Sequence, residues 1–201
     1  MSLSHCLFLK AIKGAGGDLP AVSERYPSAR EIDHYTLHEC DLSGVRAILL
    51  PAHLDQRYLG EIAPVITAFL EGGGRLVFNG HVAWPMLPEL MTFVPLASRS
   101  LENLAVVRLS PHPVFEGVEA ADLTFRRGVA GFYARGHNPP PSGAVPLTGV
   151  GPERVPCDWV LARPGGGEIF CHAGNDLWMY IDDTTTAGRI VPQLIAWAGR
   201  P

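Results

Sequence analysis

An α/β fold with a mostly parallel central sheet is predicted by residues 45–82. Two apolar runs, 45–51 and 75–81, flank an amphipathic stretch at 56–71, and we interpret this order as strand, helix, strand. Two parallel strands require a connection of this length, and such crossovers are nearly always right-handed. Hydrophobic residues make up 47% of the chain and charged residues 18%, a balance typical of globular proteins and not of disordered ones.

The stretch at 56–71 shows the features of a helix with both ends marked. Its apolar side chains recur at helical spacing along one stripe. Asp55 is placed to cap the first turn, because a carboxylate there accepts otherwise unpaired backbone N–H groups. Pro64 should kink the helix or displace its start. The glycines at 72–74 predict its end.

The rest of the chain predicts further strands around this unit. A continuous apolar run at 4–10 suits a strand covered on both faces. Residues 14–20 form a loop by composition, and 82–95 are apolar but broken by prolines. Residues 31–40 alternate moderately, as an extended segment does, but a helix with His34 and His38 as i, i+4 neighbours is the alternative. Strands are expected at 104–109, 144–148, 158–162 and 168–172, and the last two have the spacing of a hairpin. An amphipathic helix is expected at 184–198.

Composition excludes several classes of protein. The 16 basic and 20 acidic side chains are mixed along the chain, so no nucleic-acid footprint is expected. No apolar stretch reaches the ~20 residues that span a bilayer, and no signal peptide is visible. We therefore expect one cytoplasmic domain over residues 1–201, with four cysteines that stay reduced.

Polar side chains are expected where neighbouring parallel strands end. His53 and Asp55 follow the first strand of the unit, Asn79 and His81 end the second, and His172 ends a later strand. Ligands of open α/β sheets bind outside the carboxyl ends of the strands. We predict His53, His81 and His172 as catalytic residues, with Asp55 and Asn79 binding a ligand. The alternatives are hydrogen-bonded structural histidines and a helix-capping Asp55.

The segment 125–138 predicts a second part of the same site. Its arginines and its final His and Asn interleave with aromatic residues and glycines, and guanidinium groups bind carboxylate or phosphate. A small anionic or sugar-like ligand fits this chemistry; salt bridges to local carboxylates are the alternative. The predicted ligand-binding residues in and after this segment are Arg126, Arg127, Arg135, His137, Asn138, Asn175 and Asp176. No cofactor is expected, and a metal ion bound by the strand-end side chains stays open.

Several short motifs resemble a known family. The order runs from Glu71-Gly-Gly-Gly74 and Asn79-Gly80-His81 to His112-Pro113-Val114 with Gly117, then Asp158-Trp159-Val160 and Gly165-Gly-Gly167. Together these resemble the trehalose-utilisation (ThuA-like) branch of the class I glutamine amidotransferase-like superfamily. The resemblance implies a three-layer, flavodoxin-like α/β fold with a mostly parallel sheet and extra β-hairpins at one edge. Glutamine amidotransferases carry a nucleophilic Cys at the strand-to-helix elbow, and the elbow at 78–81 has none.

Two functions follow as hypotheses. In the first, the chain binds a small polar or carbohydrate-like molecule at the carboxyl edge of the sheet and acts on it as a hydrolase or isomerase without a cysteine nucleophile. In the second, it is a non-enzymatic domain that forms homo-oligomers or docks on a partner through the apolar segment 84–96. The exposure of Trp84, Met86, Leu87 and Phe93 discriminates between them, because docking requires an exposed apolar patch.

Overall fold

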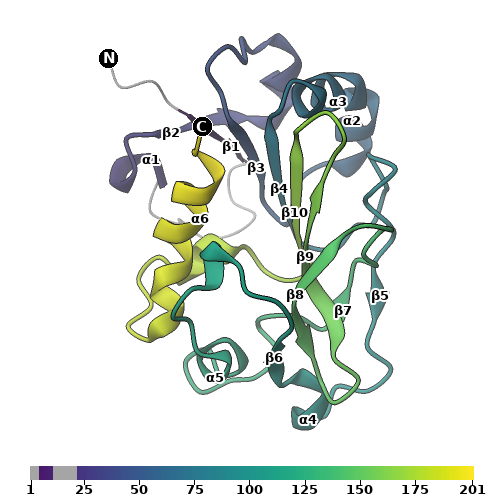
Figure 1. The fold of residues 1–201 in the computed structure, drawn as a ribbon, viewed down its shortest axis with the longest axis vertical. Helices are drawn as coiled ribbons and strands as arrows, with labels where there is room; N and C mark the ends of the chain where they lie inside the picture. The colour runs from purple at the N-terminus through teal and green to yellow at the C-terminus, as the bar shows by residue number, and fades with distance from the viewer. Residues whose placement is uncertain (1–4, 11–21) are drawn as a thin grey trace.

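The computed structural model describes residues 5–10 and 22–201. Within this part of the chain an eight-stranded sheet has the order β2-β1-β3-β4-β10-β9-β8-β6, and β5 pairs with β7 beside it (Figure 1). The strands are β1 (Cys6–Lys10), β2 (Ala29–Asp33), β3 (Ala47–Leu50), β4 (Arg75–Asn79), β5 (Val94–Pro95), β6 (Val106–Arg108), β7 (Gly136–His137), β8 (Val145–Val150), β9 (Val155–Ala162) and β10 (Glu168–His172).

The sheet has a parallel part and an antiparallel part. Strands β2, β1, β3, β4 and β10 are parallel neighbours. Strands β9, β8 and β6 continue the sheet in antiparallel pairs beyond β10. The predicted α/β class, the parallel crossover at 45–82 and the β9–β10 hairpin are therefore confirmed.

Helices and short helical turns cover both faces of the sheet. The α-helices are α1 (Val22–Arg25), α2 (Gln56–Glu61), α3 (Ala63–Glu71), α4 (Leu101–Leu104), α5 (Ala120–Thr124) and α6 (Ile190–Ala198). The 3-10 helices are η1 (His34–Glu39), η2 (Pro113–Phe115), η3 (Leu177–Tyr180) and η4 (Thr186–Arg189). Figure 1 shows α6 on one side of the sheet and α2 and α3 on the other.

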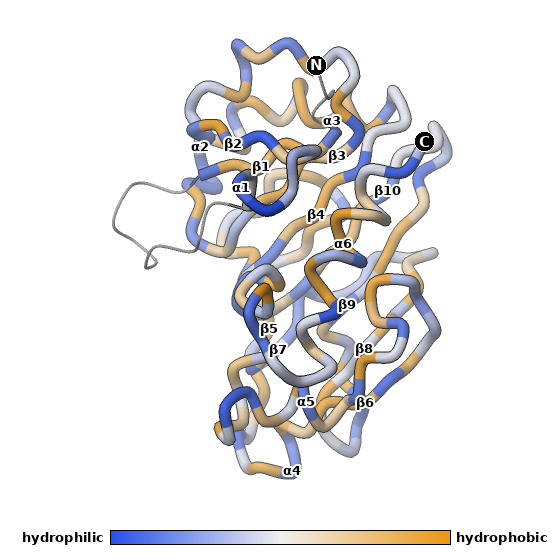
Figure 2. Tube along the Cα trace, turned by 90° about the vertical axis from the view of Figure 1, so that its left-hand side faces the viewer, coloured by the Kyte–Doolittle hydropathy of each residue, from blue (hydrophilic) through white to orange (hydrophobic). Residues whose placement is uncertain are grey.

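Alternation along the strands produces two cores. Phe8, Leu49 and Phe170 belong to the core under α6, whereas their neighbours Leu9 and Leu50 belong to the core under α2 and α3. Side chains of a strand point to opposite faces in turn, so a strand covered on both sides is apolar throughout. Figure 2 shows these hydrophobic stretches in the central strands and in α6.

Local differences from the expectations have physical causes. The predicted helix at 56–71 is two helices, because Pro64 lies in the first turn of α3 and the break falls at Ile62. For residues 31–40 the extended alternative holds only up to Asp33, whose side chain accepts the Tyr35 N–H and starts the helical turn η1. The predicted loop at 14–20 lies outside the described residues. In the described part of the chain, every helix is too short or too polar to span a bilayer.

Candidate functional site

The carboxyl ends of three strands meet at one edge of the sheet. β4 lies between β3 and β10 and is parallel to both, with Asn79 paired to His172 in register. His53 follows β3, His81 follows β4 and His172 ends β10. The expected placement of the three imidazoles on one edge is therefore observed. Their surroundings differ, since His172 is 1% exposed while His53 and His81 are exposed.

His172 is held by a buried carboxylate. Its Nδ1 lies 2.6 Å from Asp158 Oδ1, and Asp158 is fully buried. The other carboxylate oxygen accepts hydrogen bonds from the Tyr133 hydroxyl at 2.5 Å and from the Thr148 hydroxyl. Both carboxylate oxygens of Asp158 therefore have close polar partners inside the protein, as a buried polar group requires.

Strand pairing brings these side chains together. Asp158 is the register partner of His172 across β9–β10 and of Thr148 across β8–β9. The β8–β9 register shifts on either side of Thr148, which marks a β-bulge. A bulge changes the direction in which side chains point, and this one lies where Asp158 contacts residues of both neighbouring strands.

His172 is also one of the residues that line a narrow gap. Nε2 makes no hydrogen bond to any residue that the structure describes. The gap beside His172 is too narrow for a water molecule, and it is lined by Arg126, Phe132, Tyr133, His172, Asn175, Asp176, Met179 and Tyr180. Gly174 packs beside His172, because a Cβ there would clash with Tyr133 O and lie 2.6 Å from Nε2. Only a residue without a side chain fits at this point.

Asp176 adds a second titratable group to the gap. Its Oδ1 accepts the Ala52 N–H at 2.7 Å, which ties the loop after β10 to the loop after β3. Burial raises the pKa of Asp176 to about 6, and the charges of His53 and His172 counteract part of that rise. Its carboxyl group therefore exchanges protons near neutral pH.

His81 lies farther out at the same edge. Its ring stacks on Phe93, with centroids 3.6 Å apart. Partial burial lowers the pKa of His81, and the charges of His172 and His53 lower it further.

Three predicted ligand-binding residues have structural partners. Asp55 caps α2 by accepting the Arg57 and Tyr58 N–H groups, which is the alternative that the sequence left open. Asn79 donates to Leu50 O and accepts the Leu177 N–H. Asn138 donates to Gly80 O and accepts the Val82 N–H. Both amides are fully buried and hold backbone segments beside the edge.

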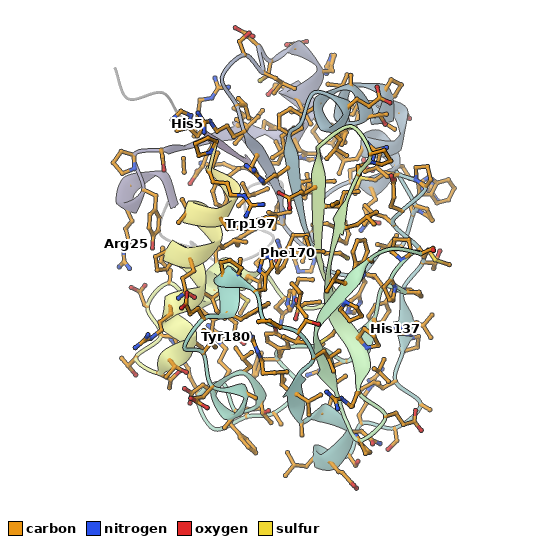
Figure 3. All side chains as sticks on the ribbon, viewed as in Figure 1. His5, Arg25, His137, Phe170, Tyr180 and Trp197 are labelled. Atoms are coloured by element: carbon orange, nitrogen blue, oxygen red, sulfur yellow. The ribbon has the colours of Figure 1, made fainter. Side chains whose placement is uncertain are left out.

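The predicted residues of segment 125–138 separate in space. Arg126 lines the gap, whereas Arg127 is exposed at a turn and the exposed Arg135 donates to Gly131 O. The Asn175 side chain donates to Phe132 O on the same wall as Arg126. His137 lies on β7, and Figure 3 shows it well apart from Tyr180, a lining residue.

The cysteines are thiols rather than nucleophiles. All four are free, as the sequence predicts. Burial raises the pKa of Cys6 to about 11 and the pKa values of Cys157 and Cys171 further. A thiol with a raised pKa is a poor nucleophile, so Cys157 is inert although it adjoins Asp158. Among residues 5–10 and 22–201, no three His, Cys, Asp or Glu side chains are grouped as metal ligands.

Sequence reasoning missed the residues that hold His172. Asp158 appeared only as part of a motif, and Tyr133 and Thr148 were not singled out. The signal was a charged residue inside the run Val155–Ala162, which is otherwise free of charges until its end. An acidic residue in the middle of a buried strand requires a partner, and a histidine on the adjoining strand supplies it.

Comparisons with known proteins identify similar folds. No protein-family model matches the chain, and no curated protein does. A solved structure titled "Cytoplasmic Protein STM3548 from Salmonella typhimurium" is similar, with a TM-score of 0.63 and 12% identity over 96% of this chain and 98% of that one. The solved "mmIFT52 N-terminal domain" gives a TM-score of 0.57 and 14% identity over 98% of each chain. At these identities the likeness concerns the fold alone.

Proposed function

We propose that this protein binds a small polar molecule at the carboxyl edge of its sheet and carries out acid–base chemistry on it through His172, as a hydrolase or isomerase. The observation that carries the proposal is the buried contact of 2.6 Å between His172 Nδ1 and Asp158 Oδ1. A carboxylate that accepts the Nδ1 proton leaves the lone pair of the neutral imidazole on Nε2.

The chemistry follows from that tautomer. Nε2 takes a proton from water or from a hydroxyl of the ligand, and Asp158 stabilises the imidazolium that forms. Asp176, on the same gap, has a pKa of about 6 and supplies a second group that gives or takes a proton near neutral pH. The exposed His53 and His81 contact the outer part of the ligand in this proposal.

Ligand entry requires the gap to widen. Phe132 is the lining residue best placed to move, since 37% of its surface is exposed. Exposed side chains change rotamer within nanoseconds, so the closed gap is compatible with binding.

The family proposal draws on the strand order. The parallel strands follow the order 2-1-3-4-5, with β10 as the fifth, and this is the order of flavodoxin-like folds. Together with the motifs at 71–81 and 158–167, it supports a place near the ThuA-like branch of the class I glutamine amidotransferase-like superfamily. The raised thiol pKa values favour a member without cysteine chemistry. Free cysteines and a similar structure titled as a cytoplasmic protein favour the cytoplasm.

The imidazole tautomer tests the proposal without a known substrate. Long-range proton–nitrogen NMR spectra of neutral His172 should show a protonated Nδ1 and an unprotonated Nε2. In Asp158→Leu, which removes the acceptor and keeps an apolar side chain of similar size, this preference should be lost. An Nε2–H tautomer in the wild type would leave His172 unable to accept a proton from the ligand and would end the proposal.

A second function is favoured by one surface feature. Trp84 is 51% exposed beside a groove of about 460 Å3 between α2 and residues 84–86. Met86 and Leu87 are buried and Phe93 stacks on His81, whereas Met91 and Val94 are 47% and 45% exposed, so part of the apolar segment 84–96 is open to a partner. A homo-oligomer in a sizing measurement that becomes monomeric in Trp84→Ala would favour this function.

A further inference from the structure

We infer that the ligand of the His172 gap carries an oxyanion, a carboxylate or a phosphate, which the guanidinium group of Arg126 binds. The inference rests on the proposed function for the location of the ligand beside His172. It adds the charge and shape of the group that the ligand must present.

The turn at 126–129 directs Arg126 inward. Arg126 and Val129 form a β-bridge, and the two residues between them have positive φ, 49° at Arg127 and 78° at Gly128. Two consecutive positive φ values are those of a type I′ turn, the tight turn that suits a hairpin. As a result Arg126 lies against the gap, while Arg127 is exposed at the tip.

The guanidinium group of Arg126 is fixed between two rings. Its central carbon lies 5.9 Å from the Phe132 ring centroid and 5.5 Å from that of Tyr180. Nη2 donates to Met179 O at 3.0 Å. A clamped guanidinium loses little freedom when it binds, so it is preorganised for a planar oxyanion.

Arg126 forms no ion pair with a described carboxylate, which is also true of the half-buried Arg108, whereas the buried Arg75 and the half-buried Arg163 each have one. Arg75 meets Glu168 and Arg163 meets Glu89, each at 2.8 Å. Arg126 forms no ion pair with any described residue, and its Nε is buried without an acceptor. A half-buried cation with an unused donor is costly unless something else neutralises it, and an oxyanion supplies both the charge and the acceptor.

The neighbouring side chains suit the remainder of such a ligand. Asp176 lines the same gap but is tied to Ala52 N–H and forms no ion pair with Arg126. It therefore leaves the guanidinium open and faces the ligand beside His172. A small hydroxy-carboxylate fits this arrangement, with its carboxylate on Arg126 and its hydroxyl toward His172.

Glycolate and its neutral amide, glycolamide, provide a matched pair of probes. In NMR titrations at constant ionic strength, glycolate should shift the Arg126 Nε–H and His172 signals saturably, and glycolamide should bind at least about tenfold more weakly, the effect of one charge-assisted contact. Inorganic phosphate in a separate titration shows which oxyanion is preferred.

Substitutions of Arg126 and Arg127 test whether the anion binds at Arg126. Arg126→Gln should weaken glycolate binding at least about tenfold, while Arg127→Gln, one residue away at the exposed tip, should leave it unchanged. If Arg126→Gln unfolds, Arg126→Lys keeps the charge but loses the planar fork, and it should still weaken binding. Equal binding of glycolate and glycolamide, no binding of either anion, or unchanged affinity in the folded Arg126 variant would overturn the inference. If anion binding requires Arg126 but His172 is the Nε2–H tautomer, the inference about the oxyanion stands and only the acid–base proposal is refuted.

Discussion

Removal of the Tyr133 hydroxyl tests whether Asp158 is a buried anion. Tyr133 is 2% exposed, and its hydroxyl donates to Asp158 Oδ2 at 2.5 Å. Tyr133→Phe keeps the ring and its packing but removes this donor. A hydrogen bond to a charged group contributes roughly 1.5–3 kcal/mol, so the free energy of unfolding should fall by about 2 kcal/mol. For a chain of this size, that corresponds to a melting temperature lower by roughly 4–8 °C.

Urea denaturation measures this change in the free energy of unfolding, and the dependence of that free energy on urea concentration should stay the same. Tyr35→Phe is the matched control, because the Tyr35 hydroxyl also donates to a carboxylate, Asp55 Oδ2 at 3.0 Å, but at the surface. In Tyr35→Phe the free energy of unfolding should fall much less, since water replaces the missing donor. Equal effects of the two substitutions, or no effect of Tyr133→Phe, would mean that Asp158 is not an ionised acceptor, and the argument for an oriented His172 would fail.

Two further predictions concern the gap. Phe132→Ala should open the gap, so that diethyl pyrocarbonate modifies His172 at least about threefold faster. Peptide mapping by mass spectrometry measures this rate. Val129→Ala, on the same loop but away from the gap, should leave the rate unchanged. Because burial raises the pKa of Asp176 to about 6, folding favours its protonated form, and wild-type stability falls as pH rises through that value. Asp176→Asn should therefore be more stable than the wild type at about pH 7.5, with the advantage gone at about pH 4, in urea titrations at both pH values. An Asn variant whose advantage does not depend on pH would refute the raised pKa.

The sequence predicted the central fold because local and global signals agree there. Between β3 and β4, apolar strands, a capping Asp55 and a glycine-rich helix end each specify the same crossover. Beyond Asp33 the moderate alternation left an extended segment and a helix both open. There the Asp33 side chain accepts the Tyr35 N–H, and this local hydrogen bond starts a 3-10 helix.

The site could be predicted only in part. Strand order places His53, His81 and His172 at one edge, and that follows from parallel neighbours alone. The pairing of His172 with Asp158 depends on the antiparallel register of β9 and β10 and on a bulge at Thr148. Neither is encoded in a short motif. The three arginines look equivalent in sequence, and only the turn at Arg127 and Gly128 makes Arg126 the one beside the gap.

Burying the polar groups of the Asp158 network is energetically costly, so the network needs an explanation other than stability of the sheet. A fully buried carboxylate, an imidazole and the Thr148 hydroxyl occupy sheet positions, and Cys157, Trp159 and Cys171 beside them are all buried and apolar. Well-packed hydrophobic residues of similar volume often replace such groups with no loss of stability, or with a gain. The fold therefore does not require a charge at this point. Our proposal of a ligand rests on this point: the network holds the His172 imidazole beside a gap that Arg126 also lines, and Arg126 forms no ion pair with any described residue.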